Sequence, residues 1–101
     1  MHKLRYHEAF HREVSKTVDW YLAHSDYSDP ASDFLDKLRE TVSAISAAPQ
    51  IWPSDIDGNR SMPMGRYPFR IVYRIEGEFL SIIALSHAKR RPGYWQKRRF
   101  K

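Results

Sequence analysis

The chain has no cysteine, only four glycines among its 101 residues, and no long apolar run. The lack of cysteine excludes disulfides, thiolate chemistry and cysteine-based zinc sites, and it suits a reducing cytoplasm. No segment approaches the roughly 20 apolar residues that a membrane helix needs, and the first ten residues lack the apolar stretch of a signal peptide. We therefore expect a cytoplasmic protein that does not enter the membrane, folded as one domain over residues 1–101.

Acidic residues are scarce in the second half of the chain. Residues 59–101 contain eleven Lys or Arg and two acids, whereas residues 1–58 contain six Lys or Arg and ten acids. The net charge of +5 therefore combines a strongly basic half with an acidic one. The basic residues are densest in residues 86–101, which hold seven Lys or Arg, three aromatic residues and no acid. Such a segment favours a polyanion or an acidic protein surface as its partner.

The acidic half predicts a short strand followed by two helices. Residues 3–7 alternate as a strand does, and apolar residues recur at a helical period over residues 8–24 and again up to residue 48. Asp29 is placed to cap the second helix, with Pro30 at its first position. Two helices joined by so short a link form an antiparallel hairpin, and each offers one apolar stripe.

The first helix places several large side chains near its apolar stripe. Its apolar positions are Phe10, Val14, Val18, Tyr21 and Leu22. We expect Trp20 to lie in the core and Tyr21 at its edge.

The basic half predicts three strands. Residues 60–64 form a weak strand whose Pro63 lacks an N–H, so this strand belongs at a sheet edge. Residues 69–75 alternate clearly, and residues 79–86 are apolar on both faces, as a central strand is. Glu76 begins the tight turn between these last two strands.

The expected fold is α+β, with the order β-α-α-β-β-β. An antiparallel-rich sheet of four strands carries the helical hairpin on one face. We expect the second face to be uncovered and to present Arg70, Arg74 and parts of a basic C-terminal tail, residues 88–101. Trp95 has an alternative role, which is to cover the open end of the sheet.

A cationic cluster follows from this topology. The strand that begins with Arg70 pairs antiparallel with the strand that ends at Ser86, so both of these ends lie at one edge of the sheet. The residues that we expect there are Arg70, His87, Lys89, Arg90, Arg91 and Tyr94. Guanidinium groups can offset charge on a phosphate, and His87 or Tyr94 could move protons in a phosphodiester cleavage without a metal. The same groups also suit a clamp for a phosphate or a protein, without catalysis.

His7 and His11 are spaced by one helical turn, a spacing that can bind a metal. Because the sequence offers no convincing third ligand, we interpret them as a solvated pair. We expect neither a metal nor a cofactor.

Two stretches resemble the RelE/ParE superfamily, the toxins of type II toxin–antitoxin pairs, also called plasmid stabilisation proteins. The first is Gly65-Arg66-Tyr67-Pro68-Phe69-Arg70-Ile71-Val72-Tyr73-Arg74, preceded by Arg60, and the second is Ser86-His87-Ala88-Lys89-Arg90-Arg91-Pro92, followed by Tyr94-Trp95. The resemblance covers essentially the whole chain. It implies growth inhibition and a partner antitoxin whose partly disordered segment folds over the helices and sheet of the toxin.

The branches of the superfamily differ in target. RelE-like members resemble ribosome-dependent endonucleases (mRNA interferases), whereas ParE-like members inhibit DNA gyrase without cutting nucleic acid. A relative that has lost toxicity and only binds an antitoxin or a nucleic acid is a third alternative. The resemblance slightly favours gyrase inhibition, which leaves the question of enzymatic activity open. A homodimer and a toxin–antitoxin hetero-oligomer are both compatible with the sequence.

The RelE-like alternative implies a catalytic set of Arg70, His87, Arg90 and Tyr94. The chain departs from that pattern at Ser61 and Pro63, near which RelE carries two catalytic lysines, and Tyr94 follows Arg90 at a shorter spacing. In either branch, we expect contact with the target or with nucleic acid from Arg60, Arg66, Arg74, Lys89, Arg91, Trp95, Lys97 and Arg98.

Overall fold

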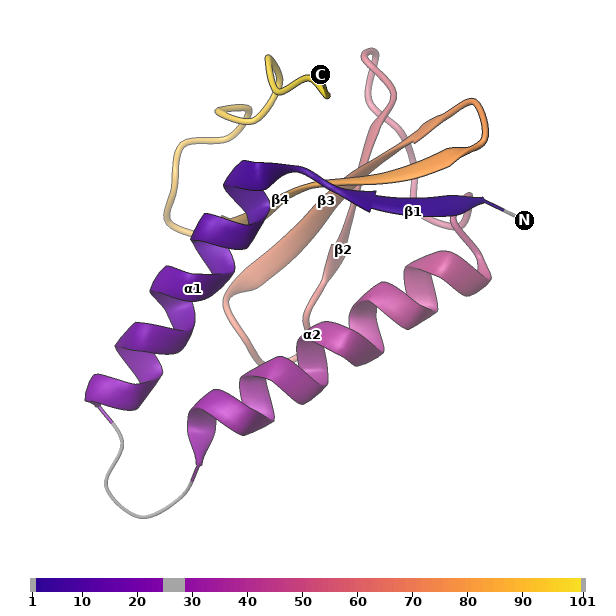
Figure 1. Cartoon of the computed structure of the whole chain (residues 1–101). Coiled ribbons are helices and arrows are strands. Elements are labelled where there is room, and N and C mark those ends of the chain that lie inside the picture. Colours follow the sequence, from indigo (N-terminus) through magenta and orange to yellow (C-terminus); the bar gives the residue numbers. More distant parts are fainter. Residues whose placement is uncertain (1, 25–28, 101) are drawn as a thin grey trace.

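The computed structural model describes residues 2–24 and 29–100. Its elements follow one another as β1 (Lys3–Tyr6), α1 (Glu8–Ala23), α2 (Pro30–Ala47), β2 (Asn59–Pro63), β3 (Phe69–Glu76) and β4 (Phe79–His87). This order confirms the predicted α+β arrangement, in which the two helices lie together on one side of the sheet (Figure 1). No helix in the described ranges is long and apolar enough to span a membrane.

Both helices begin with a capping side chain. Asp29 accepts a hydrogen bond from the Ser32 backbone N–H, and Pro30 occupies the first turn of α2, as the sequence predicts. His7 caps α1 in the same way, because its Nδ1 accepts from the Ala9 N–H at 3.0 Å. The His7 ring is therefore the N-cap of α1. The spacing of His7 and His11, which we considered for metal binding, did not indicate this role.

The sheet has the order β1-β4-β3-β2 and is mixed. β1 runs parallel to β4, while β3 is antiparallel to both of its neighbours. β4 is central and β2 forms an edge, as their sequences predict. Pro63 ends β2 opposite Arg70, where a missing N–H costs the sheet little.

A bulge in β4 changes which side chains face the helices. The pairing steps from Val72↔Ala84 to Tyr73↔Ile82, so Ile83 has no partner. Leu80 and Ile82 face the helices before the bulge, and Leu85 does so after it. Ile83 and Ala84 both lie on the opposite face. The bulge therefore reverses which side chains of the rest of β4 face the helices and which face the other side, up to the residues that lead into the tail.

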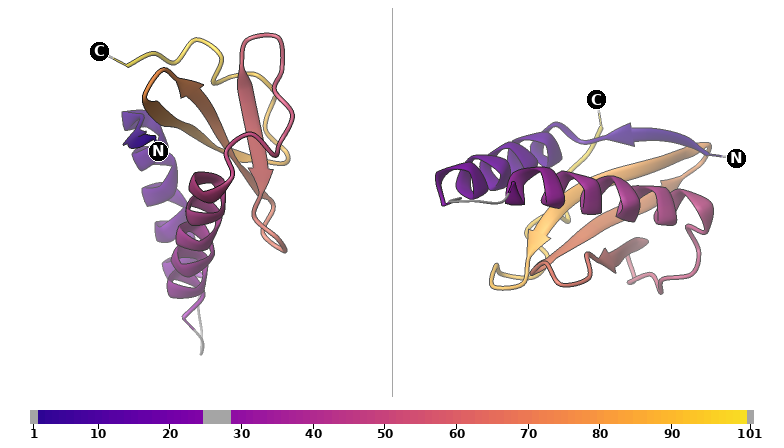
Figure 2. Two further views of the ribbon diagram at one scale, coloured as in Figure 1. Left: turned by 90° about the vertical axis from the view of Figure 1, so that its right-hand side faces the viewer. Right: turned by 90° about the horizontal axis from the view of Figure 1, so that it is seen from below.

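The main core lies between the helices and the sheet. Its buried members are Phe10, Phe34, Leu38, Ile45, Met64, Ile71, Tyr73, Leu80, Ile82 and Leu85. Tyr21 packs at the edge of this core, as expected, but the expectation for Trp20 is wrong, since 56% of its surface is exposed. Leu22 is also exposed, at 61%. The reason is visible in Figures 1 and 2, because the last turns of α1 reach beyond the end of the sheet.

The second face of the sheet is covered, contrary to our expectation of an open cationic surface. The C-terminal tail, described over residues 88–100, turns back after β4, and its Trp95 and Phe100 pack on a small buried cluster of Val72, Ile83 and Ala84. Figure 2 shows the tail on the side of the sheet away from the helices. The tail can cover this face because it carries an apolar ring on each side of its basic residues.

Candidate functional site

The end of β4 brings the predicted cluster to one edge of the sheet but divides it between two faces. Arg70 lies opposite Ser86 and Phe69 lies opposite His87, so topology places Arg70 and His87 at the same end, as predicted. His87 packs edge-on against the Phe69 ring at 5.0 Å, on the helix side. Arg70 points to the other side, where its Nε donates to the Ser61 Oγ at 2.8 Å. The structure therefore does not bring Arg70 and His87 into one cluster of side chains.

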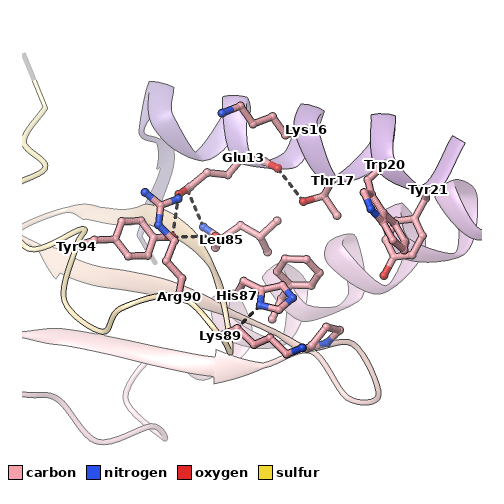
Figure 3. Close-up of a pocket in the computed structure, with 12 residues that line it drawn as sticks. Glu13, Lys16, Thr17, Trp20, Tyr21, Leu85, His87, Lys89, Arg90 and Tyr94 are labelled. Atoms are coloured by element: carbon pink, nitrogen blue, oxygen red, sulfur yellow. Dashed lines mark hydrogen bonds and ion pairs between the residues drawn. The ribbon is translucent and has the colours of Figure 1, made fainter. Parts of the chain in front are cut away.

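Glu13 on α1 organises the helix side of this edge. Its carboxylate accepts hydrogen bonds from the Leu85 backbone N–H at 3.1 Å and from the Tyr94 hydroxyl at 2.8 Å (Figure 3). The Arg98 guanidinium donates to both carboxylate oxygens, at 2.8 and 3.0 Å. One side chain thus joins α1 to β4 and to two points of the tail.

The environment of Tyr94 holds its hydroxyl in the protonated form. Burial, the hydrogen bond to Glu13 and the negative charge of that carboxylate raise the pKa of Tyr94 to about 12. The same hydroxyl lies 3.1 Å from the Leu85 carbonyl oxygen. Tyr94 therefore has a structural partner on each side and is poorly suited to exchange protons near neutral pH.

Arg90 and His87 stand beside Tyr94 at the surface. The Arg90 guanidinium lies over the Tyr94 ring, 3.8 Å from its centre, and 3.9 Å from the Glu13 carboxylate. The His87 Nδ1 accepts a hydrogen bond from the Lys89 N–H at 3.0 Å, which fixes the turn into the tail. Three of the four residues in the RelE-like set thus lie together, and Arg70 lies apart.

These residues form one wall of a groove between α1 and the end of the sheet, which we call the α1–β4 groove. Its volume is about 530 Å³. Its lining residues, all drawn in Figure 3 and most of them labelled there, are Glu13, Lys16, Thr17, Trp20, Tyr21, Pro68, Phe69, Leu85, His87, Lys89, Arg90 and Tyr94. The sequence identified four of these as site residues (His87, Lys89, Arg90 and Tyr94).

Glu13, Lys16 and Trp20 also line this groove, although the sequence did not identify them as site residues. The position of Glu13 one turn after Phe10, on the buried side of α1, was a signal that its carboxylate points inward. No sequence signal connects it to Arg98, because the two residues meet only when the tail folds back.

The remaining predicted contact residues are spread over the molecule. Arg60 donates to the backbone oxygens of Gln50 and Trp52 and so fastens the loop before β2. Arg66 lies beside the Tyr67 ring, at 5.4 Å, in the turn between β2 and β3. Arg91 and Lys97 are exposed on the tail.

Arg74 is buried, with 7% of its surface exposed. Its guanidinium donates to Asn59 Oδ1 at 2.6 Å and to the Arg98 carbonyl oxygen at 2.8 Å. Trp95 packs on the second face of the sheet, whereas its alternative role was to cover the open end. Its indole Nε1 is buried without a hydrogen-bond partner among the described residues. Arg74, Trp95 and Arg98 thus hold the tail in place and do not form an open cationic face.

The comparisons with known proteins agree with this architecture. The family described as "ParE toxin of type II toxin-antitoxin system, parDE" matches residues 4–92. The chain belongs to the ParE toxin family. The resemblance to the RelE/ParE superfamily is thereby confirmed, and within it the match is to the ParE branch.

A solved structure supports the same fold for this ParE family member. A chain of the chromosomal ParDE toxin–antitoxin system from P. aeruginosa superimposes with a TM-score of 0.73 and 19% identity. The match covers 88% of the present chain and 98% of that chain. No curated protein matches the sequence. At this identity the structural likeness concerns the fold, and the function rests on the family match.

Proposed function

We propose that this ParE family member is the toxin of a toxin–antitoxin pair and arrests growth by inhibiting DNA gyrase in the cytoplasm. The observation that carries the proposal is the ParE family match over residues 4–92. In this mechanism the protein acts by binding, and no bond is made or broken by its side chains. A cognate antitoxin keeps it inactive until the antitoxin is lost.

The arrangement of the predicted catalytic set favours binding over RNA cleavage. Phosphodiester cleavage needs a proton-transfer group and a cation within reach of the same phosphate. Arg70 is engaged with Ser61 on the tail side of the sheet, whereas His87 faces the helices. The raised pKa of Tyr94 also makes the tail tyrosine a weaker acid than an ordinary phenol.

The experiment that tests the proposal compares the two targets directly. We expect the purified protein to block supercoiling of a relaxed plasmid by gyrase and to leave mRNA intact on translating ribosomes. Cells that express it should show a DNA damage response before protein synthesis falls. Cleavage of mRNA in the ribosomal A site, together with unchanged supercoiling at micromolar toxin, would refute it.

Arg70→Ala separates the mechanisms further. This side chain is exposed, and its loss leaves Ser61 accessible to water. A gyrase inhibitor should keep most of its toxicity in this variant, whereas an endonuclease of the RelE-like type should lose it. Glu40→Ala, on the exposed side of α2, is the matched control for expression and folding.

A further inference from the structure

A cavity on the tail side of the sheet is lined by two residues whose buried N–H donors lack an acceptor. This cavity, which we call the β2–tail cavity, is lined by residues 53–55, 59–61, 72 and 95 and has a volume of about 320 Å³. Its walls therefore come from the loop before β2, from β2 itself, from β3 and from the tail. The two donors are Asn59 Nδ2 and Trp95 Nε1, and neither has a hydrogen-bond partner in the ranges 2–24 and 29–100.

The Asn59 amide is held in one orientation. Only 5% of this residue is exposed, and its Oδ1 accepts from Arg74 Nε at 2.6 Å. Turning the amide over would place its NH2 group against the Arg74 donor, so the oxygen keeps its position. The Asn59 backbone N–H is also fixed, because it donates to Asp55 Oδ1 at 2.9 Å. The side-chain NH2 group is therefore a fixed donor in the wall of the cavity.

The Trp95 indole is the second donor, and its N–H cannot act as an acceptor. The ring packs on Val72, which lines the same cavity. A buried N–H without an acceptor destabilises a protein, so two of them beside one cavity indicate that an acceptor-bearing molecule belongs there. One water molecule could accept from both, but the cavity is much larger than the roughly 30 Å³ that a water occupies.

The charges around the cavity favour an anion of low charge. Arg60 donates to two backbone carbonyl oxygens, and Arg70 donates to the Oγ of Ser61, which lines the cavity. Neither guanidinium forms an ion pair within the described part of the chain. Asp55 is the acid that lines the cavity. Two cations and one carboxylate leave a single positive charge in excess, which suits a monoanion.

We propose that the β2–tail cavity binds a small molecule that carries one carboxylate on an apolar body. The two carboxylate oxygens accept from Asn59 Nδ2 and Trp95 Nε1, and the apolar body lies against Pro53 and Val72. A phosphate monoester fits less well, because it brings nearly two negative charges beside Asp55. Binding of such a ligand goes beyond gyrase inhibition and does not depend on it.

The test is a titration of the isotope-labelled, full-length protein with benzoate, followed in a proton–nitrogen correlation spectrum. The chain has three tryptophans and a single asparagine, so both donors give signals that can be assigned. Trp95→Phe assigns the indole signal by its loss. We expect the Trp95 indole N–H and the Asn59 NH2 signals to shift with saturation, at a Kd on the order of 1 mM. The indole signal of Trp20, which is exposed on α1, should not move.

Asn59→Asp is the sharpest variant, because it keeps the oxygen that accepts from Arg74 and replaces the free donor with a negatively charged acceptor. It should weaken benzoate binding by at least about tenfold. Gln96→Glu makes the same change of amide to carboxylate at an exposed position beside Trp95 and should leave the Kd within about twofold. Trp95→Phe should weaken binding by about fivefold, measured from the Asn59 NH2 signal.

Any of four results would overturn the inference. They are no shift of the Trp95 indole signal with benzoate, an equal shift with benzyl alcohol, tighter binding of phenyl phosphate than of benzoate, and an unchanged Kd in Asn59→Asp. Urea unfolding provides a second measurement in case Asn59→Asp does not fold. Benzoate should raise the midpoint of the wild type more than that of Trp95→Phe, and equal increases would also contradict the site. Because gyrase is absent from these experiments, their outcome is independent of the proposed target.

Discussion

Glu13 and Arg98 lie 85 residues apart in the chain and form a two-bond ion pair that closes the C-terminal tail onto α1. Both side chains are largely buried, at 13% and 15% exposed. Ion pairs at this depth are costly to break on one side, because the remaining charge stays desolvated. The pair therefore gives the basic tail a defined position on the sheet, although most of its residues are polar.

Glu13→Gln should detach the tail without removing the bulk of the side chain. The amide keeps an acceptor oxygen for the Leu85 N–H, but it loses the charge that pairs with Arg98 and the second oxygen, which accepts from the Tyr94 hydroxyl. We expect a loss of about 2 kcal/mol in the free energy of unfolding. Hydrogen exchange should also become faster in residues 88–100. Urea unfolding and exchange mass spectrometry measure both effects.

Glu8→Gln is the matched control for this substitution. Glu8 lies on the same helix and pairs with Arg12 at the surface, where 86% of its side chain is exposed. Its loss should cost less than about 0.5 kcal/mol and should not change exchange in the tail. Equal effects of the two variants would contradict the anchoring role of Glu13.

Tyr94 should make the stability depend on pH at alkaline values. Its pKa is raised to about 12 in the folded protein, above the ordinary value of 10.0. The protonated phenol therefore stabilises the fold fully below about pH 10, and this contribution is lost as pH rises toward 12. Tyr94→Phe should flatten that loss. Urea midpoints from pH 8 to pH 12 provide the comparison.

The same substitution identifies the late-titrating phenol in the absorbance at 295 nm. Burial also raises the pKa of Tyr21 and Tyr73, so the difference between wild type and Tyr94→Phe isolates the group of interest. If the phenol that is missing from the Tyr94→Phe curve titrates near the ordinary value of 10.0, Glu13 does not hold the Tyr94 proton.

His7→Ala should destabilise α1 by about 1 kcal/mol, because it removes the acceptor for the Ala9 N–H. His7→Asn keeps a capping oxygen and should recover most of that loss, although it gives up the contact between His7 Nε2 and the Arg99 carbonyl oxygen. Thermal unfolding by circular dichroism ranks the variants. If Asn were no better than Ala, capping would not be the contribution of this residue.

Trp95→Ala and Trp95→Phe should differ strongly. Alanine uncovers Val72, Ile83 and Ala84 and should cost about 3 kcal/mol. Phenylalanine keeps an aromatic cover and removes an indole N–H that is buried without a partner, which lowers the cost to about 1 kcal/mol or less. Similar unfolding midpoints for both variants would show that the tail does not depend on this ring.

Local signals predicted most of the fold. Asp29 and Pro30 mark the start of α2, Pro63 marks an edge, and the apolar residues of β4 mark a central strand. Each of these features depends on neighbouring residues. The helical pattern of α1 was also correct, but its Trp20 lies beyond the end of the sheet, and a periodic pattern cannot show where the partner surface stops.

The candidate site depended on long-range relationships that the sequence does not reveal. The bulge at Ile83 decides that His87 faces the helices, yet β4 is apolar on both faces, so nothing in its sequence marks the shift. The covering of the second sheet face was mispredicted for the same reason. A basic tail is expected to lie in solvent, and the sequence does not show that Trp95, Phe100 and Arg98 contact residues far away in the chain. Topology alone correctly placed Arg70 and His87 at one end of the sheet.

The central claim is that this ParE family member acts on gyrase by binding. The most direct measurement is the formation of linear plasmid by purified gyrase in the presence of the toxin, resolved after denaturation and proteolysis of the enzyme. We predict that linear DNA accumulates with toxin concentration, and that Arg70→Ala behaves like wild type. Unchanged gyrase products at micromolar toxin, with mRNA cut on ribosomes and the cutting lost in Arg70→Ala, would contradict the account.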